Sequence, residues 1–95
     1  MAGNPAGEWQ VRLLRSARRD LAALEDQVCS EALDAIQDLA EDPFPNDCLW
    51  MRGYPNRFRI KLYGNRYRLI YDVSQNQKML KILRVRLRKD AYRGL

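Results

Sequence analysis

The sequence predicts an α+β domain: an N-terminal strand, a hairpin of two helices, then three antiparallel strands that complete one sheet, with the helices packed on one face. Residues 57–63 alternate basic and apolar side chains with the period of two that is typical of a strand. Residues 27–41 carry an apolar stripe at helical spacing. A chain of 95 residues has enough material for one core, so residues 1–95 are predicted to form a single domain.

In the first half of the chain, the pattern predicts a loose leader, one strand and two helices. Residues 1–7 contain two Gly and one Pro and form the predicted leader. Residues 8–14 place Trp9, Val11 and Leu13 on one side of a short strand. Ser16 is the predicted N-cap of a helix that runs to about Glu25. The second helix covers residues 27–41, and its predicted buried stripe comprises Cys29, Ala32, Leu33, Ile36, Leu39 and Ala40.

The second half predicts a hairpin followed by a third strand. Residues 49–55 are expected to form a loop that folds apolar side chains over the edge of the core. Gly64 and Asn65 suit a tight turn between strands 57–63 and 66–73, and counting from this turn places Lys61 opposite Arg68. Residues 78–85 have apolar side chains at both odd and even positions, so the sequence does not show which of them face the core. The register of this third strand is therefore left open. Residues 86–93 are predicted to be a loop or one helical turn.

Charge is divided unevenly between the two halves. Residues 1–47 carry four basic and ten acidic side chains, a net charge of −6, whereas residues 48–95 carry thirteen basic and two acidic ones, a net charge of +11. This asymmetry indicates that the second half binds a polyanion. The chain has no histidine, so acid–base chemistry near neutral pH must use other side chains.

The sequence offers little evidence of a metal site, a disulfide or a membrane segment. Cys29 and Cys48 are too few and too far apart for a metal site or a disulfide framework, so both are predicted to be reduced packing residues, with one bridge between them as the alternative. No apolar run reaches the length of a membrane span, and the start lacks the regions of a signal peptide. We therefore expect a cytoplasmic protein without a metal or cofactor.

The predicted hairpin carries a cationic face formed by Arg59, Lys61, Arg66 and Arg68. A solvated strand face could carry the same residues, but like charges directly opposite one another destabilise a sheet, and this favours an anionic ligand. In the tail, Arg88 and Tyr92 could form a frayed basic end with an aromatic packed on the sheet. An arginine that meets a phosphate beside a tyrosine that stacks on a base is the functional alternative.

Several motifs in these elements resemble those of the RelE/ParE toxins of bacterial toxin–antitoxin systems. The resemblance covers residues 9–93, and its most specific parts are YRLIY at residues 67–71 and the Arg-x-x-x-Tyr spacing of Arg88 and Tyr92. It implies the RelE-like fold. For the RelE branch, it further implies a metal-independent endoribonuclease that cleaves mRNA in the ribosomal A site, with the 2′-hydroxyl attacking the adjacent phosphate. The implied partners are a RelB-like antitoxin, mRNA and the ribosome, with a monomeric toxin that joins a larger complex with the antitoxin.

The resemblance also assigns roles to residues. It places the two basic positions of the first hairpin strand at Arg59 and Lys61, the transition-state arginine at Arg68, the arginine near the C-terminus at Arg88 and the stacking tyrosine at Tyr92. The chain departs at Arg59, where RelE has lysine, and at Leu87, where many members have histidine. We therefore predict a catalytic set of Lys61, Arg68, Arg88 and Tyr92, and an RNA-binding set of Arg59, Arg66, Arg84, Arg86 and Lys89.

Lys61 is the candidate general base, because neighbouring cations disfavour its charged form. Two alternative functions remain open: a gyrase inhibitor of the ParE type that is not a nuclease, and an inactive module that binds RNA or docks the antitoxin.

Overall fold

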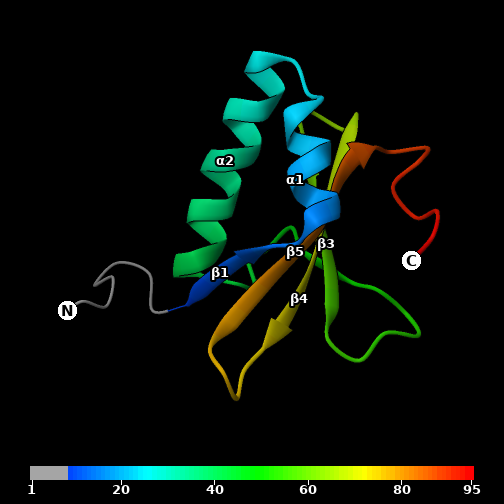
Figure 1. Cartoon of the computed structure of the whole chain (residues 1–95). Helices are drawn as coiled ribbons and strands as arrows, with labels where there is room; N and C mark the ends of the chain where they lie inside the picture. The colour runs from blue at the N-terminus through cyan, green and yellow to red at the C-terminus, as the bar shows by residue number, and fades with distance from the viewer. Residues whose placement is uncertain (1–8) are drawn as a thin grey trace.

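The computed structural model describes residues 9–95, so the predicted leader and Glu8 lie outside the described residues. In chain order the elements are β1 (Gln10–Leu13), α1 (Arg15–Ala22), α2 (Asp26–Glu41), β2 (Leu49–Trp50), β3 (Arg57–Leu62), β4 (Tyr67–Ser74) and β5 (Met79–Leu87). Both helices lie on one side of a twisted sheet (Figure 1). The predicted α+β class and the one-sided placement of the helices are therefore confirmed. Neither helix in the described part of the chain has the length and apolar content needed to span a membrane.

The sheet contains five strands in the order β1-β5-β4-β3-β2. β1 pairs with β5 in parallel, and every other pairing is antiparallel. The additional strand is β2, in the segment predicted to be a loop, and two residues are too few to produce a readable period. The expected cover over the core is confirmed for Met51, which packs against the buried cluster of Ile70, Leu83 and Ala91, but it is wrong for Leu49 and Trp50, which are 49% and 55% exposed.

α1 protects the edge of β5 beyond the end of β1. Ser16 Oγ donates to the carbonyl oxygen of Leu83 at 2.7 Å, and the amide of Val85 donates to Asp20 at 3.0 Å. Ser16 is therefore inside the helix and is not its N-cap, a position that Leu14 occupies. The helix ends at Ala22, earlier than predicted, because Glu25 is already in the extended conformation that starts α2.

α2 turns most of its predicted stripe toward the sheet. Ala32, Ile36, Leu39 and Ala40 are buried, as is Val28, which the prediction missed. Leu33 is 47% exposed because it lies on the other side of the helix, so its assignment to the core is wrong. Cys29 and Cys48 are free thiols packed against the core, which confirms the prediction of reduced packing residues.

The hairpin of β3 and β4 has the predicted register, with Lys61 opposite Arg68. Gly64 has φ +68° in the turn, where a residue without a Cβ avoids strain. β5 continues to Leu87, two residues beyond the predicted strand, and a bulge beside Ile70 and Tyr71 shifts its pairing with β4. This register brings the last residues of β5 onto the same sheet surface as the hairpin cations.

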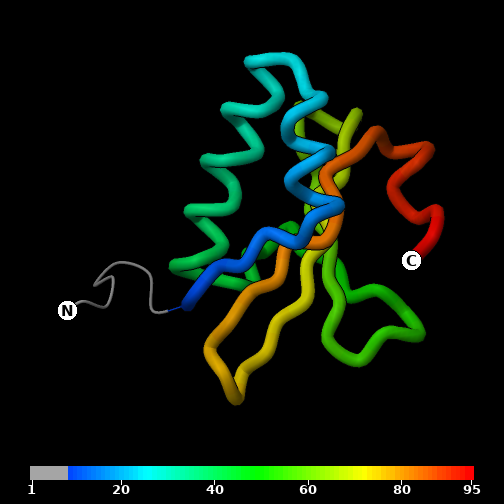
Figure 2. Tube along the Cα trace, in the orientation of Figure 1, coloured from blue at the N-terminus to red at the C-terminus, as the bar shows by residue number. Residues whose placement is uncertain are grey.

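Apolar clusters lie on both faces of the sheet. The larger one joins the helices to the sheet and includes fully buried Leu69, Tyr71, Leu80 and Ile82. On the opposite face, Ile70, Leu83 and Ala91 form a smaller cluster. Ala91 lies in the turns after β5, so its burial fixes the C-terminal segment to this face. Figure 2 shows that segment turning back on the side of the sheet away from α2.

Candidate active site

Three cations lie side by side across the centre of the sheet. Lys61 of β3 is opposite Arg68 of β4, and Arg68 is in turn opposite Arg86 of β5. Directly opposed residues point to the same face, and neighbouring strands are about 4.8 Å apart, so the row is about 10 Å long. We call Lys61, Arg68 and Arg86 the cationic row. Arg86 lies at its third position, a place that could not be read from the sequence because the register of β5 was open.

Arg68 is the buried member of the cationic row. Arg68 is only 5% exposed. One terminal nitrogen of its guanidinium donates to the carbonyl oxygens of Asn65 and Tyr67, both at 3.1 Å. Nε of Arg68 is buried and has no hydrogen-bond partner among residues 9–95. A buried donor without a partner costs about 1–3 kcal/mol. The described chain therefore leaves one charged N–H group of Arg68 buried and unsatisfied within the cationic row.

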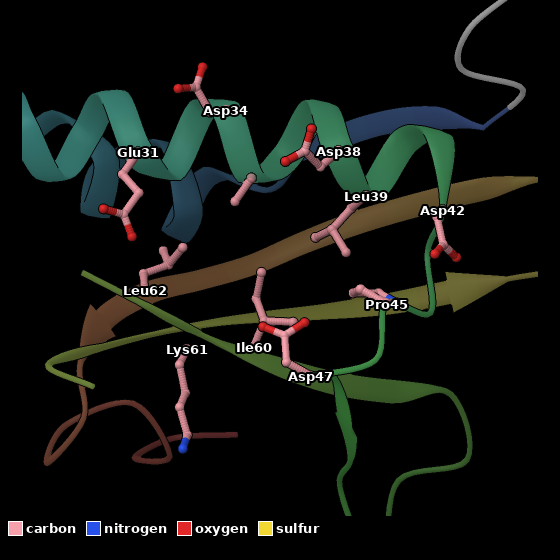
Figure 3. Close-up of a pocket in the computed structure, with 11 residues that line it drawn as sticks. Glu31, Asp34, Asp38, Leu39, Asp42, Pro45, Asp47, Ile60, Lys61 and Leu62 are labelled. Atoms are coloured by element: carbon pink, nitrogen blue, oxygen red, sulfur yellow. The ribbon is translucent and has the colours of Figure 1, made fainter. Parts of the chain in front are cut away.

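Lys61 differs from Arg68 because its side chain is exposed. In Figure 3 it extends away from the groove between α2 and β3 and toward the opposite face. No hydrogen bond or ion pair holds its ammonium group within residues 9–95. Lys61 can consequently reach a ligand that binds over the cationic row.

Tyr92 reaches the same face from the C-terminal segment. Its hydroxyl is hydrogen-bonded by the Arg59 guanidinium, whose central carbon lies 5.5 Å from the centre of the tyrosine ring. Tyr92 is 40% exposed, although its neighbour Ala91 is completely buried. The tail is thus anchored rather than frayed, and it presents one aromatic ring beside β3.

Arg66, Arg88 and Lys89 surround a shallow hollow of about 340 Å³ at the hairpin end of the sheet, with Asn65 and Leu87. The backbone amide of Arg88 donates to the carbonyl oxygen of Arg66 at 2.8 Å, which fixes this corner of the tail. All three cationic side chains are exposed. The hollow therefore adds positive charge next to Arg68 and Arg86.

Arg84 stands apart from this group. Its guanidinium forms two hydrogen bonds with the carboxylate of Asp20, at 2.9 and 3.0 Å, and fastens α1 to β5. Arg57 donates in the same way to the carboxylate of Asp72, and this hydrogen bond raises the pKa of Arg57. Both arginines join structural elements, whereas the cations of the row have no carboxylate partner within residues 9–95.

Solved structures with this fold include bacterial and archaeal toxins. The isolated RelE toxin of Escherichia coli is 22% identical, with a TM-score of 0.74 over 83% of each chain. A chain in the RelBE2 toxin–antitoxin complex of Mycobacterium tuberculosis is 27% identical, with a TM-score of 0.71 over 84% of this chain and 98% of that one. A chain in the RelE–RelB complex of Pyrococcus horikoshii is 23% identical, with a TM-score of 0.70 over 87% of this chain and 98% of that one. The fold is therefore that of the RelE-like toxins.

The sequence pattern of one family covers most of the chain. The family is described as ParE toxin of type II toxin–antitoxin system, parDE, and it matches residues 11–92. The chain belongs to this family and so to the RelE/ParE superfamily, as its motifs predicted. No curated protein is significantly similar in sequence.

Proposed function

We propose that this toxin is a metal-independent endoribonuclease that cleaves mRNA in the ribosomal A site. The observation that carries the proposal is the buried Nε of Arg68, which has no partner within residues 9–95 and lies between Lys61 and Arg86 in the cationic row. A preorganised cation in a dry site stabilises negative charge much better than one in water. A phosphate in the transition state of cleavage is such a charge.

In the proposed reaction, the neutral form of Lys61 removes the proton of the ribose 2′-hydroxyl. The 2′-oxygen then attacks the adjacent phosphorus, and the bond from phosphorus to the 5′-oxygen breaks. The leaving 5′-oxygen takes a proton from water, and Arg88 is the candidate group that neutralises the negative charge developing on it. The products are a 2′,3′-cyclic phosphate and a 5′-hydroxyl end, and Arg68 with Arg86 stabilises the charge that develops on the phosphate.

The remaining cations and Tyr92 bind and orient the RNA in this proposal. Tyr92 is anchored by Ala91 and Arg59, so its ring can stack on a base next to the scissile bond. Arg59, Arg66 and Lys89 attract the phosphate backbone. Arg84 has this role only if RNA displaces Asp20, because the carboxylate already occupies its guanidinium.

The proposed partner is a RelB-like antitoxin, since the related chains from Mycobacterium tuberculosis and Pyrococcus horikoshii were solved in toxin–antitoxin complexes. The cationic row is expected to attract an acidic part of this antitoxin. The toxin alone is proposed to be a monomer, and mRNA on the ribosome is the proposed target.

A second candidate function is inhibition of DNA gyrase without nuclease activity. The observation that favours it is the family match to ParE toxins. Because the helices and sheet are common to both branches, the discriminating feature is the cationic row with its unsatisfied Nε.

One experiment separates the two candidates. Purified toxin is added to a translating extract and the 5′ ends of the mRNA are mapped, while gyrase supercoiling is measured in parallel. We expect new 5′-hydroxyl ends in the presence of ribosomes, no change in supercoiling, and loss of cleavage in Arg68→Met. Inhibition of supercoiling with intact mRNA would refute the nuclease proposal and support the alternative.

A further inference from the structure

A carboxylate on α2 holds the turn that joins β3 to β4. The backbone amide of Tyr63 donates to Glu31 Oε2 at 2.5 Å, and the Tyr63 hydroxyl donates to Gln27 Oε1 at 3.4 Å. Gln27 and Glu31 are four residues apart, so they share one side of the helix. Figure 3 shows the Glu31 side chain directed from α2 toward Leu62, the residue before Tyr63. The first residue of the turn is therefore fixed to α2 through both its backbone and its side chain.

Tyr63 has a backbone conformation that it would rarely adopt unaided. Its φ is +52°, in the left-handed region, where a side chain with a Cβ is disfavoured. A residue keeps such a conformation only when its surroundings hold it there, and residues of this kind are concentrated at functional sites. The bond from the Tyr63 amide ends on an ionised carboxylate, which makes it stronger than a bond between neutral groups. Glu31 therefore stabilises a turn conformation that the backbone alone would not favour.

In this conformation the turn supplies two carbonyl oxygens to the candidate active site. The carbonyl oxygen of Asn65 accepts a hydrogen bond from the Arg68 guanidinium at 3.1 Å. The carbonyl oxygen of Arg66 accepts one from the Arg88 amide at 2.8 Å. Within the turn, the Arg66 amide donates to the carbonyl oxygen of Tyr63 at 3.3 Å, which links both positions to the residue held by α2. One turn thus positions two members of the predicted catalytic set.

We propose that Glu31 is a positioning residue of the active site, which acts from α2 through the turn. Without its carboxylate the turn is released, and the carbonyl oxygens that hold Arg68 and Arg88 move with it. A misplacement of about 1 Å is enough to slow a reaction strongly. Both arginines keep their charge in this event, so cleavage should suffer more than RNA binding. The effect on cleavage rests on the proposed nuclease function, whereas the hold on the turn does not.

Three substitutions on α2 isolate this role. Glu31→Ala removes the acceptor, and Glu31→Gln keeps an acceptor oxygen without the charge. Asp34→Ala is the matched control, because it removes the charge of an exposed carboxylate that Figure 3 shows turned outward from α2. We expect the single-turnover rate constant for mRNA cleavage at saturating toxin to fall about tenfold in Glu31→Ala and to stay within about threefold of wild type in the other two. The half-saturating toxin concentration should change by about twofold or less in all three.

The rate constant at saturation separates positioning from a loss of folded protein. Unfolded molecules raise the apparent half-saturating concentration, but they leave the rate constant of the folded toxin unchanged. Equal rate constants for Glu31→Ala and Asp34→Ala would overturn the proposal. A loss in Glu31→Gln as large as that in Glu31→Ala would also overturn it, because the acceptor oxygen would then not be the group that acts.

Hydrogen exchange tests the hold on the turn without RNA. The amides of Tyr63 and Arg88 should exchange about tenfold faster in Glu31→Ala than in wild type, because both of their hydrogen bonds depend on the turn. Amides in the middle of β4 should keep their wild-type rates, and Asp34→Ala should change none of them. An Arg88 amide that keeps its wild-type rate in Glu31→Ala would overturn the proposal. Because this measurement needs no RNA, a wild type that cleaved no mRNA would refute the nuclease function, and the role of Glu31 in the turn would still be decided.

Discussion

Arg68 and Arg84 allow a matched test of which sheet arginine serves folding and which serves catalysis. Both lie on the sheet, but Arg84 is paired with Asp20 through two hydrogen bonds, whereas Arg68 has two bonds to carbonyl oxygens and an unsatisfied Nε. Replacement of each by Met keeps a long side chain and removes the charge. The two substitutions should therefore have different effects on stability.

The magnitudes follow from these contacts. Arg84→Met leaves the Asp20 carboxylate, which is 11% exposed, without its cation, and this should lower the free energy of unfolding by about 2–3 kcal/mol. Arg68→Met loses two hydrogen bonds but also removes the buried unpaired donor, whose cost is about 1–3 kcal/mol. These terms nearly cancel, so its free energy of unfolding should change by about 1 kcal/mol or less. Cleavage, in contrast, should fall by about 10² or more in Arg68→Met.

The assay is urea denaturation followed by tryptophan fluorescence, combined with single-turnover RNA cleavage and RNA binding. RNA affinity should fall only modestly in Arg68→Met, because many other cations remain. Equal losses of affinity and rate would show that Arg68 only docks RNA. A loss of stability in Arg68→Met as large as that in Arg84→Met would show that the unsatisfied Nε carries no folding cost, and the reasoning would be refuted.

Four further substitutions test the site and the core. Lys61→Ala should abolish cleavage. Lys61→Arg should be equally inactive, because a guanidinium stays protonated, and activity in this variant would mean that position 61 supplies charge and not a base. Tyr92→Leu should weaken RNA binding by about 1–3 kcal/mol and leave stability nearly unchanged, and a thermal melt that shifts strongly would indicate a packing role instead. Burial raises the pKa of Tyr71, whose hydroxyl also donates to the carbonyl oxygen of Pro43 at 2.7 Å. The stability linked to this shift is complete below the ordinary tyrosine pKa of about 10 and is lost as pH rises above it, so denaturation measured from pH 8 to 11 should show a steeper loss in wild type than in Tyr71→Phe.

The sequence alone determined the α+β class, both helices and the hairpin register, because each depends on contacts between residues close in the chain. The alternation in residues 57–63 and the Gly64–Asn65 turn sufficed to place Lys61 opposite Arg68. Local pattern failed at the ends of elements. Serine is a common N-cap residue, yet the hydroxyl of Ser16 donates to the carbonyl oxygen of Leu83. This carbonyl lies on the edge of β5 and has no partner from β1, so tertiary packing decides the role of Ser16.

Only the tertiary structure decided which cations act together. The bulge beside Ile70 sets the register that brings Arg86 to Arg68, while Arg84, two residues earlier, is occupied by a carboxylate from α1. Both arginines look alike in the sequence, since their difference depends on contacts across more than sixty residues. In the same way, the acidic residues of α2 suggest an ordinary solvated face, and only the tertiary structure places Asp38 beside Ile60 and Leu62 around one pocket. Sequence period specifies which face a side chain takes, but pairing between distant strands specifies its neighbours.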